Sequence, residues 1–235
     1  MSNIKILNCN AYDYLPKIKT NSVDLILTDP PYNISKYSTG NIIFNNRKNI
    51  NNDIAKWDNV EINIEELSKQ FTRILKPTGN MFIFTGYNNL GKWHYYLDPL
   101  FDTFQIMIWH KINPTPKFYK NGFLNSCEII ICLWNKYHTW NFTSQDDMHN
   151  FIETNICSYP ERISKPFHPT QKPIKVLNKI ISVASNENDI VFDPFMGVGS
   201  TGIACMQLNR KFLGIEIDRN YYNATISRLK DVKRY

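Results

Sequence analysis

The sequence lacks the usual marks of a disulfide-rich, zinc-binding or membrane protein. Its five cysteines are an odd number, lie far apart and form no C-x-x-C pair, so neither a disulfide framework nor a metal site is predicted. No apolar run approaches the roughly 20 residues of a membrane-spanning helix, and the first ten residues contain no signal-peptide core. We therefore expect a protein of the cytoplasm that has no contact with a membrane.

A strong charge imbalance and internal repeats are also missing. The 27 Lys and Arg residues against 21 Asp and Glu give a formal net charge of +6, which permits a polyanionic partner without requiring one. At 235 residues and 43% hydrophobic composition, the chain suits a single α/β domain over 1–235.

Short apolar segments rich in β-branched residues recur along the chain, as expected for strands buried on both faces. The predicted strands are 4–9, 23–29, 80–86, 104–110, 128–134, 189–195 and 211–217. Segments with apolar residues three and four apart predict helices over 64–79, 172–185, 200–209 and 219–232. Alternating strands and helices predict an α/β fold with a doubly wound, mostly parallel sheet.

A glycine loop near the end of the chain indicates a nucleoside ligand. Gly197, Gly199 and Gly202 fit the G-x-G-x-x-G spacing between a strand and a helix, which lets a ligand approach the backbone. Glu216 follows Gly197 by 19 residues (216 − 197) at the end of the next strand, where a carboxylate can accept both ribose hydroxyls. These residues alone do not separate NAD from S-adenosylmethionine.

Asp193, directly before this loop, favours S-adenosylmethionine as the cofactor. A carboxylate there would repel the pyrophosphate of a dinucleotide, but it would attract an amino group or a sulfonium. S-adenosylmethionine carries both of these cations and no phosphate.

The stretch Asp29-Pro30-Pro31-Tyr32 follows the predicted strand 23–29 at the same edge of the sheet. An exocyclic amine of a nucleobase is a poor nucleophile, because its lone pair is delocalised into the ring. Asp29 and the carbonyl of Pro30 can accept its two hydrogens, and proline leaves no competing N–H. Tyr32 can stack on a base flipped out of a duplex. An ordinary Asp-Pro turn explains the first two residues but not the whole motif.

These motifs resemble those of the S-adenosylmethionine-dependent DNA amino-methyltransferases. "DPPY" (29–32) resembles the family's catalytic motif, "DPFMGVGST" (193–201) its cofactor loop, and "HPTQKP" (168–173) the segment before its cofactor half. The cofactor loop comes 164 residues after the catalytic motif (193 − 29), an order similar to the permuted β class found in restriction-modification systems. The resemblance implies a seven-stranded Rossmann-like sheet with its cofactor-binding half at 168–235.

The resemblance also implies further contacts with the cofactor. "NCNAYDYL" (8–15) is similar to the strand end that meets the adenine, although many relatives have Asp at the place of Asn10. The residues implied in this way, with Asp29, are Cys9, Asn10, Ala11, His168, Thr170, Lys172, Phe195, Ser200 and Thr201. Lys172 is a candidate for the cofactor carboxylate. The alternatives are ordinary structural roles, such as a loop histidine, a solvated lysine, a core phenylalanine and helix caps.

Two polar, aromatic-bearing segments interrupt the pattern, 33–59 and 136–167, and loops of this length are typically functional or disordered. We expect 33–59 to be a mobile DNA-contacting loop, and the resemblance places target recognition in 136–167. The predicted DNA contacts are Lys36, Arg47, Lys48, Arg162 and Lys165, with Arg162 the best candidate for a guanine edge. Surface loops without such a role are the alternative. The short recognition segment favours a homodimer, and a cognate restriction endonuclease is a further expected partner.

We therefore expect direct methyl transfer to the N6 amine of adenine in double-stranded DNA. No cysteine stands in the catalytic motif, so covalent attack on the base is not supported. Family tendency favours adenine for the Asp form of the motif, with N4-methylation of cytosine as the alternative. Methylation of RNA or of a protein glutamine, and a catalytically silent DNA-binding module, remain as rival interpretations.

Overall fold

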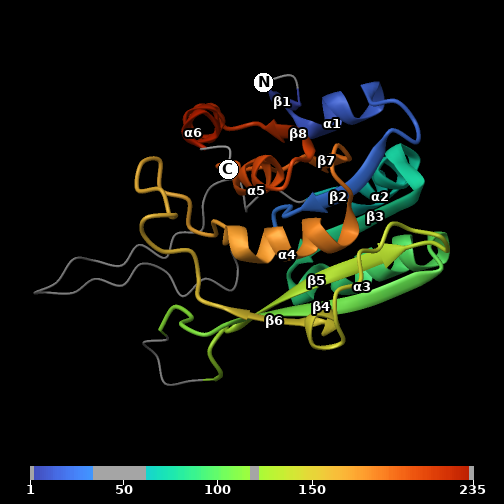
Figure 1. Ribbon diagram of the computed structural model, residues 1–235, viewed down its shortest axis with the longest axis horizontal. Helices are drawn as coiled ribbons and strands as arrows, with labels where there is room; N and C mark the ends of the chain where they lie inside the picture. Colours follow the sequence, from blue (N-terminus) through green and yellow to red (C-terminus); the bar gives the residue numbers. More distant parts are fainter. Residues whose placement is uncertain (1–2, 34–61, 117–121, 233–235) are drawn as a thin grey trace, which may run out of the picture.

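The computed structural model describes residues 3–33, 62–116 and 122–232, and its centre is an eight-stranded sheet of order β1-β8-β7-β2-β3-β5-β4-β6 (Figure 1). The strands are β1 (Ile4–Asn8), β2 (Val23–Thr28), β3 (Leu75–Thr85), β4 (Thr103–Lys111), β5 (Cys127–Trp134), β6 (Phe151–Thr154), β7 (Ile190–Asp193) and β8 (Lys211–Glu216). Among these described strands, only β5 runs antiparallel to its neighbours. The predicted α/β fold with a mostly parallel sheet is confirmed.

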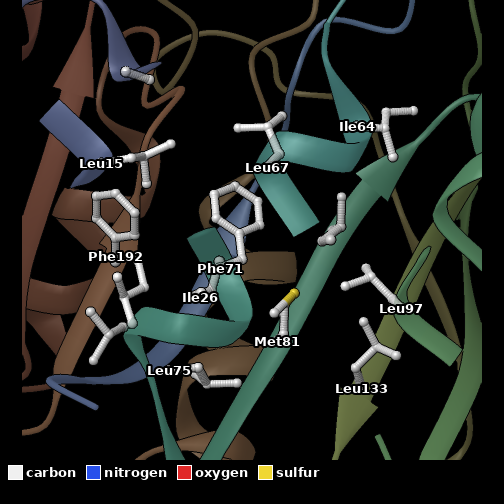
Figure 2. Packing of buried hydrophobic residues seen from close by; sticks show 14 of the residues in the cluster. Leu15, Ile26, Ile64, Leu67, Phe71, Leu75, Met81, Leu97, Leu133 and Phe192 are labelled. Atoms are coloured by element: carbon white, nitrogen blue, oxygen red, sulfur yellow. The ribbon is translucent and has the colours of Figure 1, made fainter. Parts of the chain in front are cut away.

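Helices cover both faces of the sheet. They are α1 (Ala11–Tyr14), α2 (Ile64–Ile74), α3 (Tyr87–Leu97), α4 (Ile174–Ala184), α5 (Ser200–Gln207) and α6 (Arg219–Asp231). Along β3, Met81 and Ile83 join the core under α2 and α3, while Phe82 and Phe84 join the core under α4 and α5. This alternation follows from the two-residue period of a strand buried on both faces. Figure 2 shows the first core, where side chains of α2 meet those of β2, β3 and β7.

Apart from the short helix α1, which was also not predicted, three elements differ from the sequence predictions. The eighth strand, β6, pairs with β4 at the edge of the sheet and lies inside the segment 136–167. The predicted helix 64–79 ends at Ile74, and the residues after it begin β3, because Pro77 and Gly79 do not suit a helix interior. Helix α3 was not predicted, since its two asparagines and Gly91 obscure the apolar pair Trp93 and Leu97.

The topology brings the two predicted motifs together. Strands β2 and β7 are parallel neighbours at the centre of the sheet, but the chain leaves them in opposite directions, through α2 to β3 and through α5 to β8. Such a switch point opens a crevice at the carboxyl ends of the two strands. Asp29 follows β2 and Gly197 follows β7, so both motifs border this crevice. No helix in the described part of the chain is long and apolar enough to cross a membrane.

Candidate active site

A cleft at this switch point contains most of the predicted site residues. It has about 660 Å³ of empty space including its open mouth. The predicted residues that line it are Asp29, Pro31, His168, Thr170, Lys172, Asp193, Phe195, Gly197, Ser200, Thr201 and Glu216. The structure therefore brings the catalytic motif, the "HPTQKP" segment and the glycine loop to one place.

The glycine loop needs glycine at two positions. Gly197 and Gly199 have φ angles of +53° and +77°, which side-chain-bearing residues rarely adopt. A Cβ atom on Gly197 would also lie 2.9 Å from Nε2 of His168, and one on Gly199 would lie 2.4 Å from Cγ2 of Thr225. At Gly197 the loop thus presents bare backbone to the cleft, shortly before α5 begins at Ser200.

Glu216 is held at the end of β8 with its carboxylate in the cleft. Oε2 accepts a hydrogen bond of 2.9 Å from the backbone N–H of Gly197, and Oε1 accepts one of 2.7 Å from that of Asp218. Burial raises the pKa of Glu216 to about 7 in spite of these bonds. Because each carboxylate oxygen can accept a second donor, a ribose diol can still bind here.

Asp193 holds the start of the glycine loop in place by hydrogen bonds. Oδ1 accepts hydrogen bonds from the Thr28 hydroxyl (3.0 Å) and the backbone N–H of Phe195 (3.1 Å), and Oδ2 accepts one from the Thr201 hydroxyl (2.7 Å). Burial raises the pKa of Asp193 to about 6. The hydroxyl hydrogen of Thr201 is therefore donated to Asp193. The expected contact between Asp193 and the ammonium group of the cofactor stays a prediction.

The start of α3 fixes the conformation of the catalytic motif. The backbone carbonyl of Tyr32 accepts hydrogen bonds from the side-chain amides of Asn88 (2.7 Å) and Asn89 (3.0 Å). The hydroxyl of Tyr32 donates to Oδ1 of Asp29 at 2.6 Å. The two asparagines were not predicted, although "TGYNN" directly after a strand end was the available signal.

Asp29 belongs to a cluster of four charges, of which Lys172 is buried and the other three are partly buried. The ammonium of Lys172 pairs with Oδ2 of Asp29 and lies 3.3 Å from Oε2 of Glu128. The other oxygen of Glu128 pairs with the ammonium of Lys111 at 2.8 Å. Lys172 therefore contacts the carboxylate of Asp29, and its expected contact with the cofactor carboxylate stays a prediction. Glu128 was missed, although a lone acid in the apolar run "EIIICLW" signals a special role.

The pKa values in this cluster follow from burial and from the ion pairs. Burial raises the pKa of Asp29, although Lys172 and the Tyr32 hydroxyl oppose the shift. Burial disfavours the charged form of Lys172, but Asp29 and Glu128 together raise its pKa. Burial likewise opposes ionisation of Glu128, but Lys172 and Lys111 hold its pKa below the ordinary value. Lys172 and Glu128 are therefore both charged at neutral pH.

His168 packs as a neutral ring against the glycine loop. Its ring centre lies 4.7 Å from that of Tyr221. Burial lowers the pKa of His168 to about 3, with further lowering from the charges of Lys172 and Arg162. His168 therefore offers the cleft a polar ring without a positive charge.

Arg162 holds the backbone of the "HPTQKP" segment. Its Nη2 atom donates to the carbonyls of Pro169 (2.9 Å) and His168 (3.4 Å), and its guanidinium lies 4.6 Å from the ring centre of Phe167. These contacts place Arg162 beside the cleft; its predicted contact with a guanine stays a prediction.

Comparison with known proteins shows to which family the chain belongs. The model of the N6/N4 DNA methylases matches residues 23–227. The chain belongs to this DNA methylase family.

Two curated methyltransferases are similar to this DNA methylase over nearly its full length. It is 32% identical to the type II methyltransferase M.HinfI of Haemophilus influenzae over 248 residues, covering 97% of the chain and 68% of that protein. It is 28% identical to the type II methyltransferase M2.LlaDCHI of Lactococcus lactis subsp. cremoris over 254 residues, covering 99% and 91%.

Solved structures agree. The complex of M1.HpyAVI with S-adenosylmethionine matches with a TM-score of 0.68 and 27% identity, covering 96% of this chain and 100% of that one. The PvuII cytosine-N4-specific DNA methyltransferase matches with a TM-score of 0.75, covering 100% and 89%, but at 16% identity it shows the fold alone. The cofactor of the DNA methylase is S-adenosylmethionine. The positive-φ cradle at Gly197 and the buried carboxylate of Glu216 fit its adenosine half.

Some predicted cofactor residues lie near the cleft without lining it. Cys9, Asn10 and Ala11 follow β1, whose last residue, Asn8, donates to the carbonyl of Glu216 at 2.8 Å. The side chain of Asn10 instead accepts from the backbone N–H of Tyr12 and caps α1. The predicted adenine contacts therefore lie next to Glu216 in the chain fold, and their roles stay predictions.

The predicted DNA-contacting residues fall into two groups. Lys36, Arg47 and Lys48 lie outside the described residues. In 136–167, the part up to the end of β6 at Thr154 belongs to the protein body, because Asn141 bonds to the carbonyl of Val183 and β6 extends the sheet. The part after β6 carries exposed Lys165 and leads into the cleft at His168.

Proposed function

We propose that this DNA methylase transfers the methyl group of S-adenosylmethionine to the N6 amine of an adenine flipped out of duplex DNA. The observation that carries the proposal is the position of Asp29, which lines the same cleft as the glycine loop and Glu216. A methyl donor bound over the loop and an amine bound to Asp29 would meet within one cleft.

The residues of the motif account for activation of the amine. One amine hydrogen bonds to the carboxylate of Asp29 and the other to the carbonyl of Pro30, which leaves the nitrogen lone pair directed at the methyl group. Methyl transfer would form the C–N bond as the C–S bond of the donor breaks, leaving a neutral thioether. The methylated nitrogen would then pass one proton through the carboxylate of Asp29 to water. Direct transfer needs no covalent intermediate with the protein.

The choice of adenine rests on the resemblance of the Asp29-Pro30-Pro31-Tyr32 motif to its adenine-methylating form. Cytosine N4 is the alternative, because its exocyclic amine would bind the same two acceptors. The fold does not separate the two bases, since the cytosine-specific PvuII enzyme shares it.

The remaining assignments belong to the same proposal. Gly197, Gly199, Ser200 and Glu216 bind the cofactor, and the part of 136–167 after β6 contacts DNA near the cleft. The type II names of the relatives favour a role beside a restriction endonuclease. A homodimer and a cytoplasmic location remain predictions.

Transfer of a tritiated methyl group tests the substrate class. The purified protein is given labelled S-adenosylmethionine with duplex genomic DNA, RNA or a protein extract in separate reactions. Label is expected in the duplex DNA only, and it should be absent with the Asp29→Ala variant. Label in RNA or protein in place of DNA would contradict the proposal.

A further inference from the structure

Both oxygens of the catalytic carboxylate already have a donor in this structure. Oδ1 of Asp29 accepts from the hydroxyl of Tyr32, and Oδ2 accepts from the ammonium of Lys172. The proposed reaction requires Asp29 to accept a hydrogen from the target amine. Lys172 is therefore the donor with which an N–H of the amine has to compete at Oδ2, the oxygen that Tyr32 does not bind.

A second carboxylate is available to this ammonium. Oε2 of Glu128 lies 3.3 Å from Nζ of Lys172, and the side chain of Glu128 is only 14% exposed. Lys111 holds Glu128 from the other side at 2.8 Å. Because Glu128 comes from β5 and not from the catalytic loop, it can keep its position while the loop binds a base.

The surroundings of Lys172 allow its ammonium to move between the two acids. Nζ lies 5.0 Å from the ring centre of Phe84 and 5.7 Å from that of Tyr32, within the range of cation–π attraction. Lys172 is 6% exposed, so its charge needs an anionic partner at every stage.

We propose that Lys172 stands in for the target amine on Asp29, and that Glu128 is the positioning residue which takes over the ammonium of Lys172 when the base enters. Before the base binds, Lys172 provides a donor for Oδ2 of the partly buried Asp29 carboxylate, beside the Tyr32 hydroxyl on Oδ1. When the base binds, the amine replaces Lys172 on Asp29, and Lys172 turns fully to Glu128. This inference rests on the proposed amine methylation.

Two variants test the exchange. In Glu128→Gln the ammonium has Asp29 as its one remaining carboxylate in the cluster, so it competes with the amine, and single-turnover methylation is expected to fall roughly 10-fold or more. In the double variant Glu128→Gln/Lys172→Met this competitor is gone, so the rate should rise several-fold above that of Glu128→Gln. A merely structural role for the two residues predicts the opposite, a double variant as slow as the single one or slower.

Two controls keep the test specific. Glu65→Gln makes the same chemical change at an exposed carboxylate on α2, which accepts a hydrogen bond from the Tyr96 hydroxyl outside the cleft, and it should leave the rate unchanged. Calorimetric affinity for S-adenosylmethionine should stay within about twofold in Glu128→Gln and Glu65→Gln, since neither residue lines the cleft. Lys172 does line it, so the rate of the double variant is measured at saturating cofactor.

A structure of the wild-type protein with duplex DNA and a non-reactive cofactor analogue gives a second measurement that depends on no variant. The ammonium of Lys172 should then contact Glu128 and no longer Asp29. The inference is overturned if Lys172 stays on Asp29 beside a bound base, or if the double variant is no faster than Glu128→Gln. Absence of any DNA methylation by the wild-type protein would instead overturn the proposed function.

Discussion

The hydroxyl of Tyr32 donates a hydrogen bond of 2.6 Å to the carboxylate of Asp29, three residues earlier in the same loop. The aromatic residue of the motif therefore has a contact that stacking alone does not require. By fixing one carboxylate oxygen, Tyr32 leaves the other as the acceptor in the cleft. Its ring and its hydroxyl have separable roles.

Substitution of Tyr32 separates these roles. Tyr32→Phe keeps the ring and loses one hydrogen bond to a carboxylate, so it should slow methyl transfer by roughly 10-fold at most. Tyr32→Trp should also retain part of the activity. Tyr32→Ala loses the stacking surface as well and should be slower still. Single-turnover rates check this order, and a Phe variant as inactive as the Ala variant would contradict the stacking role.

Asp29→Ala should abolish methyl transfer while cofactor binding persists. The substitution removes the acceptor that orients the amine, whereas the ribose carboxylate Glu216 and the glycine loop are untouched. The expected pair of results is no transfer of label above background and an affinity for S-adenosylmethionine close to that of the wild type. A large loss of that affinity would instead assign Asp29 mainly to the cofactor.

Asn89→Ala should destabilise the protein, because the carbonyl of Tyr32 loses one of its two amide donors. Asn89 is 8% exposed, and loss of a buried hydrogen-bond partner costs about 1–3 kcal/mol in the free energy of unfolding. Urea denaturation measures this cost. Asn220→Ala, at an exposed position in the first turn of α6, is a matched control and should change stability much less.

Binding of S-adenosylmethionine should strengthen as the pH rises through about 7. The pKa of Glu216 is raised to about 7 by burial, so its carboxyl group is largely protonated below this pH. Only the ionised form can accept both ribose hydroxyls, and at pH 6 about a tenth of it remains, which allows up to about a tenfold weaker affinity than at pH 8.

Calorimetric titration of wild type and Glu216→Gln at the two pH values isolates this effect from titration of the cofactor itself. The pH dependence should shrink in the variant, whose amide does not titrate. An equal dependence in both proteins would contradict the assignment of Glu216 to the ribose. Glu216→Ala should weaken binding at pH 8 by about 1–3 kcal/mol.

Local sequence patterns predicted most of the fold. The seven apolar segments are strands. A short strand that is buried on both faces needs an almost continuous apolar run such as "VDLILT", and no other element of this length needs such a run. Strand β6 escaped prediction since "FIET" is short and, at the edge of the sheet, only half apolar. Local patterns also missed α3, whose amphipathic signal rests on few buried side chains.

The parts of the site that lie within one sequence motif could be predicted. Contacts between residues far apart in the sequence could not. The spacing between Gly197 and Glu216 predicts the cofactor loop from the sequence alone. The pair of Lys172 with Asp29 joins residues 143 positions apart, and Glu128 reaches them from β5, the one described strand that runs against its neighbours. Only the packed sheet shows that these charges share a site.

The central claim is that an adenine N6 amine receives the methyl group in the cleft between the two motifs. The most direct test is digestion of DNA methylated by the purified protein, followed by mass spectrometry of the nucleosides. The account predicts N6-methyldeoxyadenosine, absent when the Asp29→Ala variant replaces the wild type. N4-methyldeoxycytidine as the product would contradict the claim for adenine.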